Sequence, residues 1–83
     1  MDCIQAFGDV LRSERLRLGL TQQDLALRAG VHLNFVGRIE RGQAEPSLST
    51  IFSIAQALEM APESIIQKVG QLFTGRNSPE FSE

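Results

Sequence analysis

Two short segments with helical spacing of apolar residues stand so close together in the middle of the chain that their relative arrangement is tightly restricted. The pattern indicates one helix over 22–29 and another over 33–41. Only Gly30, Val31 and His32 lie between them, and a glycine after the last helical turn can adopt a left-handed conformation without steric cost. Because so short a connection cannot bring two helices antiparallel, we expect them to cross steeply around Gly30.

The side-chain sizes at the predicted crossing agree with this geometry. Ala26 falls at the closest approach of the two helices, where a larger side chain would wedge them apart. Gly30 makes the turn. The positions that must be apolar are Leu25, Ala26, Ala29, Val31, Val36 and Ile39. Seven steric requirements met at fixed offsets favour a helix-turn-helix over a chance pattern in a helical chain.

Start and stop signals divide the rest of the chain into three further helices. The first is expected over 4–18, because Gly19 stops it and Thr21 is the N-cap of the following helix. The other two are expected over 48–58, after a Pro-Ser loop, and over 62–73, which begins with proline. Tyr and Trp are absent while Leu, Ile, Ala, Gln, Glu and Arg are common, so the predicted fold class is all-α.

Length and composition set the domain count and exclude several classes of protein. The chain has 83 residues, of which 42 % are hydrophobic and 22 % charged, as in one ordinary soluble domain. We expect one domain containing the helix-turn-helix over 1–73 and a frayed, polar tail over 74–83. No stretch approaches the ~18 apolar residues of a membrane span, so a cytoplasmic location without a membrane partner is expected.

The residues that usually carry chemistry are too few for an active site. Cys3 and His32 are the single cysteine and the single histidine, so neither a disulfide nor a Cys/His zinc site can form within the chain. There is no catalytic set of Ser, His and Asp beyond chance and no glycine loop that would hold a phosphate. We therefore expect no enzymatic activity, no metal and no cofactor.

Positive charge is concentrated in the middle of a mildly acidic protein. The net charge is −2, yet residues 12–42 contain six arginines against Glu14, Asp24 and Glu40. The flanking segments 1–11 and 43–83 are both acidic overall. A local basic segment suits a polyanion bound at one face, although a solvated helical surface would have a similar composition.

The sequence resembles the Cro/XRE family of helix-turn-helix DNA-binding proteins, which includes phage repressors and the controller proteins of restriction-modification systems. The resemblance runs from about Phe7 to Leu58. It rests on Leu11-Arg12-Ser13-Glu14-Arg15, Gly19-Leu20-Thr21-Gln22-Gln23-Asp24-Leu25-Ala26, Gly30-Val31, Val36-Gly37-Arg38-Ile39-Glu40-Arg41-Gly42 and Pro46-Ser47-Leu48. It implies a compact five-helix, lambda-repressor-like domain, usually a two-fold dimer on a palindromic operator.

The resemblance further implies that the helix over 33–41 lies in the major groove of double-stranded DNA, which is wide enough for one helix. Leu33, Asn34 and Arg38 then match the family's base readers. Their chemistry is suitable, because Asn can pair with adenine, Arg with guanine, and Leu can contact a thymine methyl. Alternatively, Asn34 only supports the first helical turn and Arg38 is solvated. Gly37 departs from the small hydroxyl residue common there, which indicates a close approach or a tolerant position.

Five further residues are candidate DNA contacts beside these readers: Gln22, Gln23, His32, Phe35 and Arg41. Gln22 is expected to hold a phosphate, because the backbone N–H groups and the dipole at the first turn of a helix attract anions, and its side chain could also contact a base. The resemblance makes Arg41 a second phosphate contact. Gln23 can equally be an exposed polar residue, His32 an N-cap, and Phe35 a partly buried core residue.

One pair of opposite charges is expected to be structural. Arg15 falls in the apolar row that Phe7 and Leu11 begin, so its charge needs a partner. The resemblance supplies Glu40 as that partner, in an ion pair that joins the first helix to the third.

The last predicted helix carries more apolar side chains than the edge of a small core requires, and Phe52 lies off the inward row of the preceding helix. We expect a symmetric homodimer whose seam contains Phe52, Ile66, Val69 and Phe73. These residues could instead only close the monomer core. The predicted function is a sequence-specific transcriptional regulator on a palindromic operator, either a restriction-modification controller or a phage-type repressor. The alternative is an antitoxin, or another interaction module that neutralises a protein partner and regulates its own operon.

Overall fold

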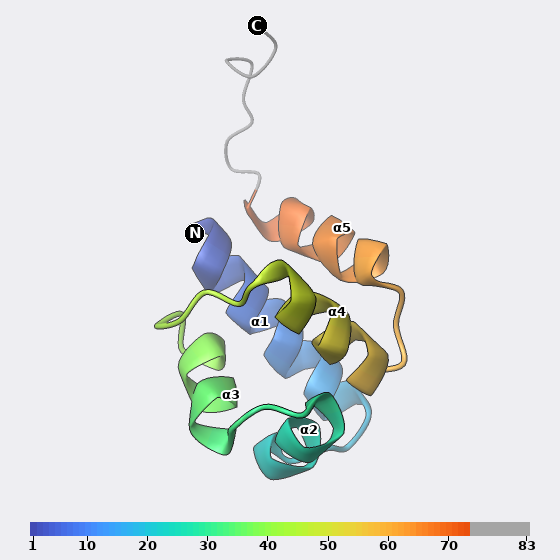
Figure 1. The fold of residues 1–83 in the computed structure, drawn as a ribbon. Helices are drawn as coiled ribbons and strands as arrows, with labels where there is room; N and C mark the ends of the chain where they lie inside the picture. Colours follow the sequence, from blue (N-terminus) through green and yellow to red (C-terminus); the bar gives the residue numbers. More distant parts are fainter. Residues whose placement is uncertain (74–83) are drawn as a thin grey trace, which may run out of the picture.

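Five α-helices follow one another along residues 1–73, the part of the chain that a computed structural model describes (Figure 1). They are α1 (Cys3–Arg17), α2 (Gln22–Ala29), α3 (Leu33–Glu40), α4 (Leu48–Ala57) and α5 (Pro62–Phe73). No strand occurs within these residues, so the all-α prediction is confirmed. The predicted tail over 74–83 lies outside the described residues.

The predicted bounds of α2 and α5 are confirmed, and three other helices end one residue earlier than expected. Leu18, Arg41 and Leu58 are C-caps rather than helical residues, each with ψ within a few degrees of zero. Their backbone N–H groups still donate to carbonyls of the last turn. Because the apolar pattern continues through such a cap, the sequence alone placed each end one residue too late. The first helix also begins one residue earlier than expected, at Cys3.

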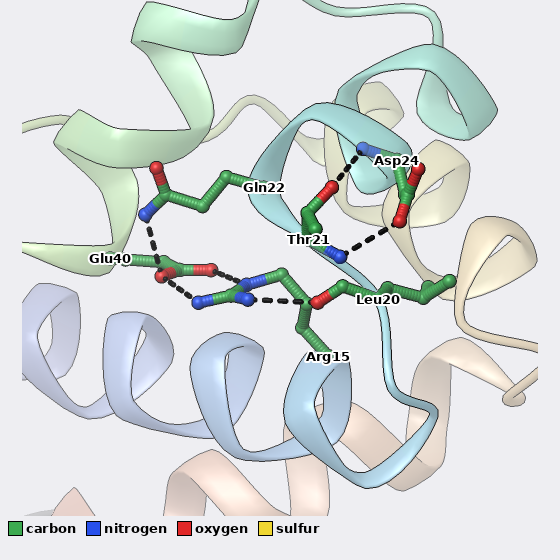
Figure 2. Close-up of polar contacts among 6 residues, drawn as sticks. All are labelled: Arg15, Leu20, Thr21, Gln22, Asp24 and Glu40. Atoms are coloured by element: carbon green, nitrogen blue, oxygen red, sulfur yellow. Dashed lines mark hydrogen bonds and ion pairs between the residues drawn. The ribbon is translucent and has the colours of Figure 1, made fainter.

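Side chains cap the helix starts as the sequence predicts for α2, and also at a position the sequence analysis missed. The Thr21 hydroxyl accepts from the Asp24 N–H, and the Asp24 carboxylate accepts from the Thr21 N–H, both at 2.9 Å (Figure 2). Asp2 and Gln5 form the same reciprocal pair at the start of α1. These bonds satisfy backbone donors that the first turn leaves open.

The capping bonds between Thr21 and Asp24 also affect the pKa of Asp24. The N–H and hydroxyl of Thr21 lower this pKa below its ordinary value, since both bonds stabilise the ionised carboxylate. The resulting stabilisation is present above the pKa of the unfolded state and is lost as pH falls through the lower folded-state pKa. In an NMR titration, Thr21→Ala should raise the midpoint of the Asp24 carboxyl only in part, because alanine removes the hydroxyl and keeps the backbone N–H. A midpoint unchanged by that substitution would contradict the role given to the Thr21 hydroxyl.

The helix-turn-helix is formed by α2 and α3, and its buried residues are those the sequence predicts. Leu25 and Ala26 of α2 and Val36 and Ile39 of α3 are at most 4 % exposed. Ala29 and Val31 are half-buried against the same core. Gly30 has φ 72° and ψ 32°, the left-handed conformation expected of it. The steep crossing is therefore made around Gly30, with the small Ala26 between the helices.

The remaining three helices pack against this pair or against one another. α1 packs against both α3 and α5, while α4 packs against α2 and α5. In Figure 1, α2 and α3 lie at one end of the molecule and α5 lies toward the other. This arrangement leaves the outer side of α3 uncovered by the helices of residues 1–73. Among those residues, no helix combines the length and apolar character needed to span a membrane.

Candidate nucleic-acid interface

The outward face of α3 brings together four of the side chains that the sequence predicts as DNA contacts. Leu33 is 44 % exposed, and Asn34, Arg38 and Arg41 are exposed as well. Val36 and Ile39, on the opposite side of the helix, are fully buried. The exposed set lines a shallow hollow together with Gln22 and Gly37. A helix anchored on one side and open on the other has the form required to enter a groove.

The other three predicted contacts, Gln23, His32 and Phe35, do not line this hollow. Gln23 is exposed on α2, and His32 is exposed at the N-cap position of α3, where its side chain makes no capping hydrogen bond. Phe35 is half-buried and packs against the hydrophobic core. The partly buried alternative for Phe35 is thus the one that the structure favours.

Both arginines of the face are held by Gln43, which lies three residues after the end of α3. Arg38 Nη2 donates to the Gln43 carbonyl at 3.3 Å, and Arg41 Nε donates to Gln43 Oε1 at 3.3 Å. These bonds are long and exposed, so they orient the guanidinium groups and remain easily replaced by DNA acceptors. The sequence analysis missed Gln43, and its place directly after Gly42 is the signal that could have found it.

Arg15 and Glu40 form the predicted ion pair, and it extends into a larger network (Figure 2). Arg15 Nε and Nη2 donate to the two Glu40 carboxylate oxygens at 2.6 and 2.9 Å. Arg15 Nη1 donates to the Leu20 carbonyl at 2.9 Å. The hydrogen bond with Glu40 raises the pKa of Arg15 above its ordinary value, so the guanidinium stays charged. The pair ties α1 to the end of α3.

Gln22 joins the same network, a contact that the sequence analysis did not predict. Its Nε2 donates to Glu40 Oε1 at 3.0 Å. The carboxylate therefore engages one hydrogen of the amide group that was expected to serve a phosphate. The difference arises because α2 starts beside the last turn of α3, within reach of Glu40.

The group that closely approaches Gly37 is the Arg41 side chain and not a backbone segment. A Cβ at this position would lie 3.0 Å from Arg41 Nη1 and 3.7 Å from Gln22 Oε1. The missing side chain thus leaves space that the Arg41 guanidinium occupies, one turn further along the helix.

The predicted seam residues lie on α4 and α5, away from this face. Phe52 is 56 %, Ile66 50 % and Phe73 40 % exposed, whereas Val69 is 6 % exposed and belongs to the core. For Val69 the structure favours the alternative of a core residue, because α5 turns Ile65 and Val69 inward together. An apolar groove between the two helices is lined by Leu48, Ile51, Phe52, Pro62, Glu63 and Ile66.

The steep α2–α3 crossing and the open face of α3 define a helix-turn-helix domain. The helix-turn-helix family HTH_3 matches residues 11–65. The chain therefore belongs to this family of Cro/XRE-type helix-turn-helix proteins, as its sequence resemblance predicts.

Three relatives show the range of proteins that share the domain. The transcriptional regulator ClgR of Mycobacterium tuberculosis is 33 % identical over 67 residues, which are 81 % of this chain and 60 % of ClgR. The control protein C.SmaI of Serratia marcescens is 30 % identical over 70 residues, 84 % of this chain and 83 % of C.SmaI. The crystal structure of the restriction-modification controller protein C.AhdI from Aeromonas hydrophila matches with a TM-score of 0.73 and 39 % identity, over 75 % of this chain and 94 % of C.AhdI. These relatives are named as regulators, not as enzymes.

Proposed function

We propose that this chain is a sequence-specific transcriptional regulator whose residues 1–73 bind a palindromic DNA operator as a homodimer. The observation that carries the proposal is the two-sided character of α3. Its inner side is buried through Val36 and Ile39, while Asn34, Arg38 and Arg41 stand exposed on the outer side. Amide and guanidinium groups on an accessible helix face suit the major groove, where each base pair presents its own pattern of donors and acceptors.

The relatives favour one type of regulator over others. C.SmaI and C.AhdI are controller proteins, and each is matched over most of its own length. ClgR, in contrast, is matched over 60 % of its length. We therefore propose a restriction-modification controller as the type of regulator.

Selection of bound fragments from a random duplex library tests the proposal. We expect the recovered sequences to share a palindrome whose half-sites lie about one helical turn, or ~34 Å, apart, because a two-fold dimer presents two copies of α3. A library that yields no preferred sequence, even at low salt, would contradict sequence-specific binding and favour a protein-interaction module.

Arg38 is expected to carry base preference. Arg38→Ala should relax the preference at one position of each half-site, with a loss of ~1–3 kcal/mol in discrimination. The measurement is the affinity of wild type and variant for operators altered one base pair at a time. Arg41→Ala is the comparison variant: as a phosphate contact, it should weaken all sequences alike and lower the salt slope by about 1. Unchanged operator preference after Arg38→Ala would contradict the assignment.

The groove between α4 and α5 is proposed as the dimer seam. Its most exposed members, Leu48, Phe52 and Ile66, are 71 %, 56 % and 50 % exposed, more apolar area than an isolated surface residue presents. Ile66→Asp should shift the protein to monomer in sedimentation at tens of micromolar, because a carboxylate would be desolvated in the seam. Leu16→Asp, which alters an equally exposed leucine outside the groove, should leave the dimer intact. A monomeric wild type at these concentrations would contradict the dimer.

A further inference from the structure

We propose that Gln22 is a specificity-determining residue. Its amide oxygen accepts a hydrogen bond from the exocyclic amino group of an adenine or a cytosine in the major groove. The inference rests on the proposed function and adds the chemistry of one base contact. It goes beyond the phosphate clamp and the unspecified base contact that the position of Gln22 at the start of α2 led us to expect.

The orientation of the Gln22 amide is set by Glu40. An ionised carboxylate only accepts hydrogen bonds, so the amide must turn its NH₂ end toward Glu40, and Nε2 lies 3.0 Å from Oε1 of that carboxylate. The carboxylate is itself fixed in orientation, because two Arg15 nitrogens donate to its two oxygens. A flipped amide would place two oxygens against each other. Glu40 is thus a positioning residue for Gln22.

With the nitrogen fixed inward, the amide oxygen points to the reading face. Figure 2 shows the oxygen directed away from Glu40. It lies 3.7 Å from the point where a Gly37 side chain would begin, and Gln22 lines the same hollow as Leu33, Asn34 and Arg38. Gly37 places no side chain of its own beside this oxygen, and the group that fills the Gly37 space is the guanidinium of the exposed Arg41.

An acceptor at this place selects its partner by chemistry. Phosphate oxygens cannot donate to Oε1, and guanine and thymine present only acceptors and a methyl group in the major groove. The amino groups of adenine and cytosine are the donors that the major groove offers. The second hydrogen of Nε2 remains available to a phosphate, so the two kinds of contact involve different atoms of one side chain.

The first test needs no DNA. In the NMR spectrum of the free protein, the Gln22 Nε2 proton bonded to the Glu40 carboxylate should lie further downfield than either side-chain amide proton of Gln23. Gln23 is exposed on the same helix, so its pair of protons gives the reference positions of a solvated amide. Absence of the shift at Gln22 would overturn the orientation on which the inference depends.

The second test uses a selected operator in which single adenines or cytosines are replaced by analogues that lack the exocyclic amino group. Wild type should lose about 2- to 10-fold in affinity at the base that Gln22 reads, the effect of one hydrogen bond. Gln22→Met should show a similar loss on the natural operator and no further loss with that analogue. Gln23→Met should keep the wild-type sensitivity.

Two outcomes separate the failure of this inference from that of the proposed function. If operator selection yields no preferred sequence, the regulator proposal fails and the inference fails with it. If an operator is selected but Gln22→Met retains sensitivity to every analogue, the base contact is wrong while the regulator proposal stands. A third outcome is that the affinity loss of Gln22→Met disappears only when one phosphate is replaced by a neutral methylphosphonate. That result would assign Gln22 to the phosphate backbone and overturn the inference.

Discussion

Replacing Glu40 by alanine is expected to lower the free energy of unfolding by about 3–5 kcal/mol, the usual cost of removing one partner from a buried ion pair. The Glu40 side chain is 3 % exposed and that of Arg15 9 %. Truncation would leave the Arg15 guanidinium bonded to the Leu20 carbonyl without a compensating carboxylate and would remove the acceptor of Gln22. Chemical denaturation followed by far-UV circular dichroism measures the change.

A second ion pair in the molecule supplies the comparison. Arg17 Nε donates to Glu14 Oε1 at 2.7 Å, but the Arg17 side chain is 55 % exposed. Arg17→Ala should therefore cost no more than about 1 kcal/mol, as for surface pairs. If Glu40→Ala proved as mild as Arg17→Ala, the Arg15–Glu40 pair would not be the link between α1 and α3 that the structure indicates.

Replacing both partners by apolar residues separates the contribution of the charges to stability from that of side-chain packing. The double variant Arg15→Met, Glu40→Leu should recover much of the stability lost in Glu40→Ala, because no uncompensated charge remains in the interior. The same variant removes the acceptor that orients Gln22. It should therefore be folded and yet altered in operator preference, which a purely structural pair would not produce.

The helix-turn-helix could be predicted from sequence because its constraints are local. Gly30 and Ala26 lie within the unit itself, and a turn of three residues leaves few ways to join two helices. The need of Arg15 for a partner was also accessible, because a charge in an apolar row requires one, whereas Glu40 was identified only through the family resemblance. The hydrogen bond from Gln22 to Glu40 was not accessible, because it joins residues 18 apart whose side-chain directions follow from how α2 and α3 cross.

The rotation of α5 shows another limit of the pattern. Its bounds over 62–73 could be predicted, but the helix carries apolar residues on more than one side. The core takes Ile65 and Val69, four residues apart, and leaves Ile66 exposed. Which of these faces is buried depends on the positions of α1 and α4, and the sequence of α5 alone does not give those positions.

Gly8 is a signal of tertiary structure that the helical pattern alone did not reveal. A glycine in the middle of a helix costs about 1 kcal/mol relative to alanine, so its presence there suggests a packing reason. In the structure α1 is buried at Gly8 against the last turn of α3. A Cβ on Gly8 would collide with the Ile39 carbonyl oxygen and lie 2.9 Å from that of Glu40.

Gly8→Ala is therefore expected to destabilise the protein by about 3 kcal/mol, at the upper end of overpacking costs, although alanine is the better helix former. The colliding atoms are backbone, which no change of rotamer can move. Gly70→Ala is the matched control, since a Cβ there meets no atom within 4 Å, and it should stabilise α5 by ~0.5–1 kcal/mol. Chemical denaturation of both variants measures the change in the free energy of unfolding. Equal changes would mean that α1 does not contact α3 at Gly8. Because the displaced carbonyls belong to Ile39 and Glu40, the collision would also push the end of α3 away from the core, so operator affinity should fall in Gly8→Ala and stay unchanged in Gly70→Ala.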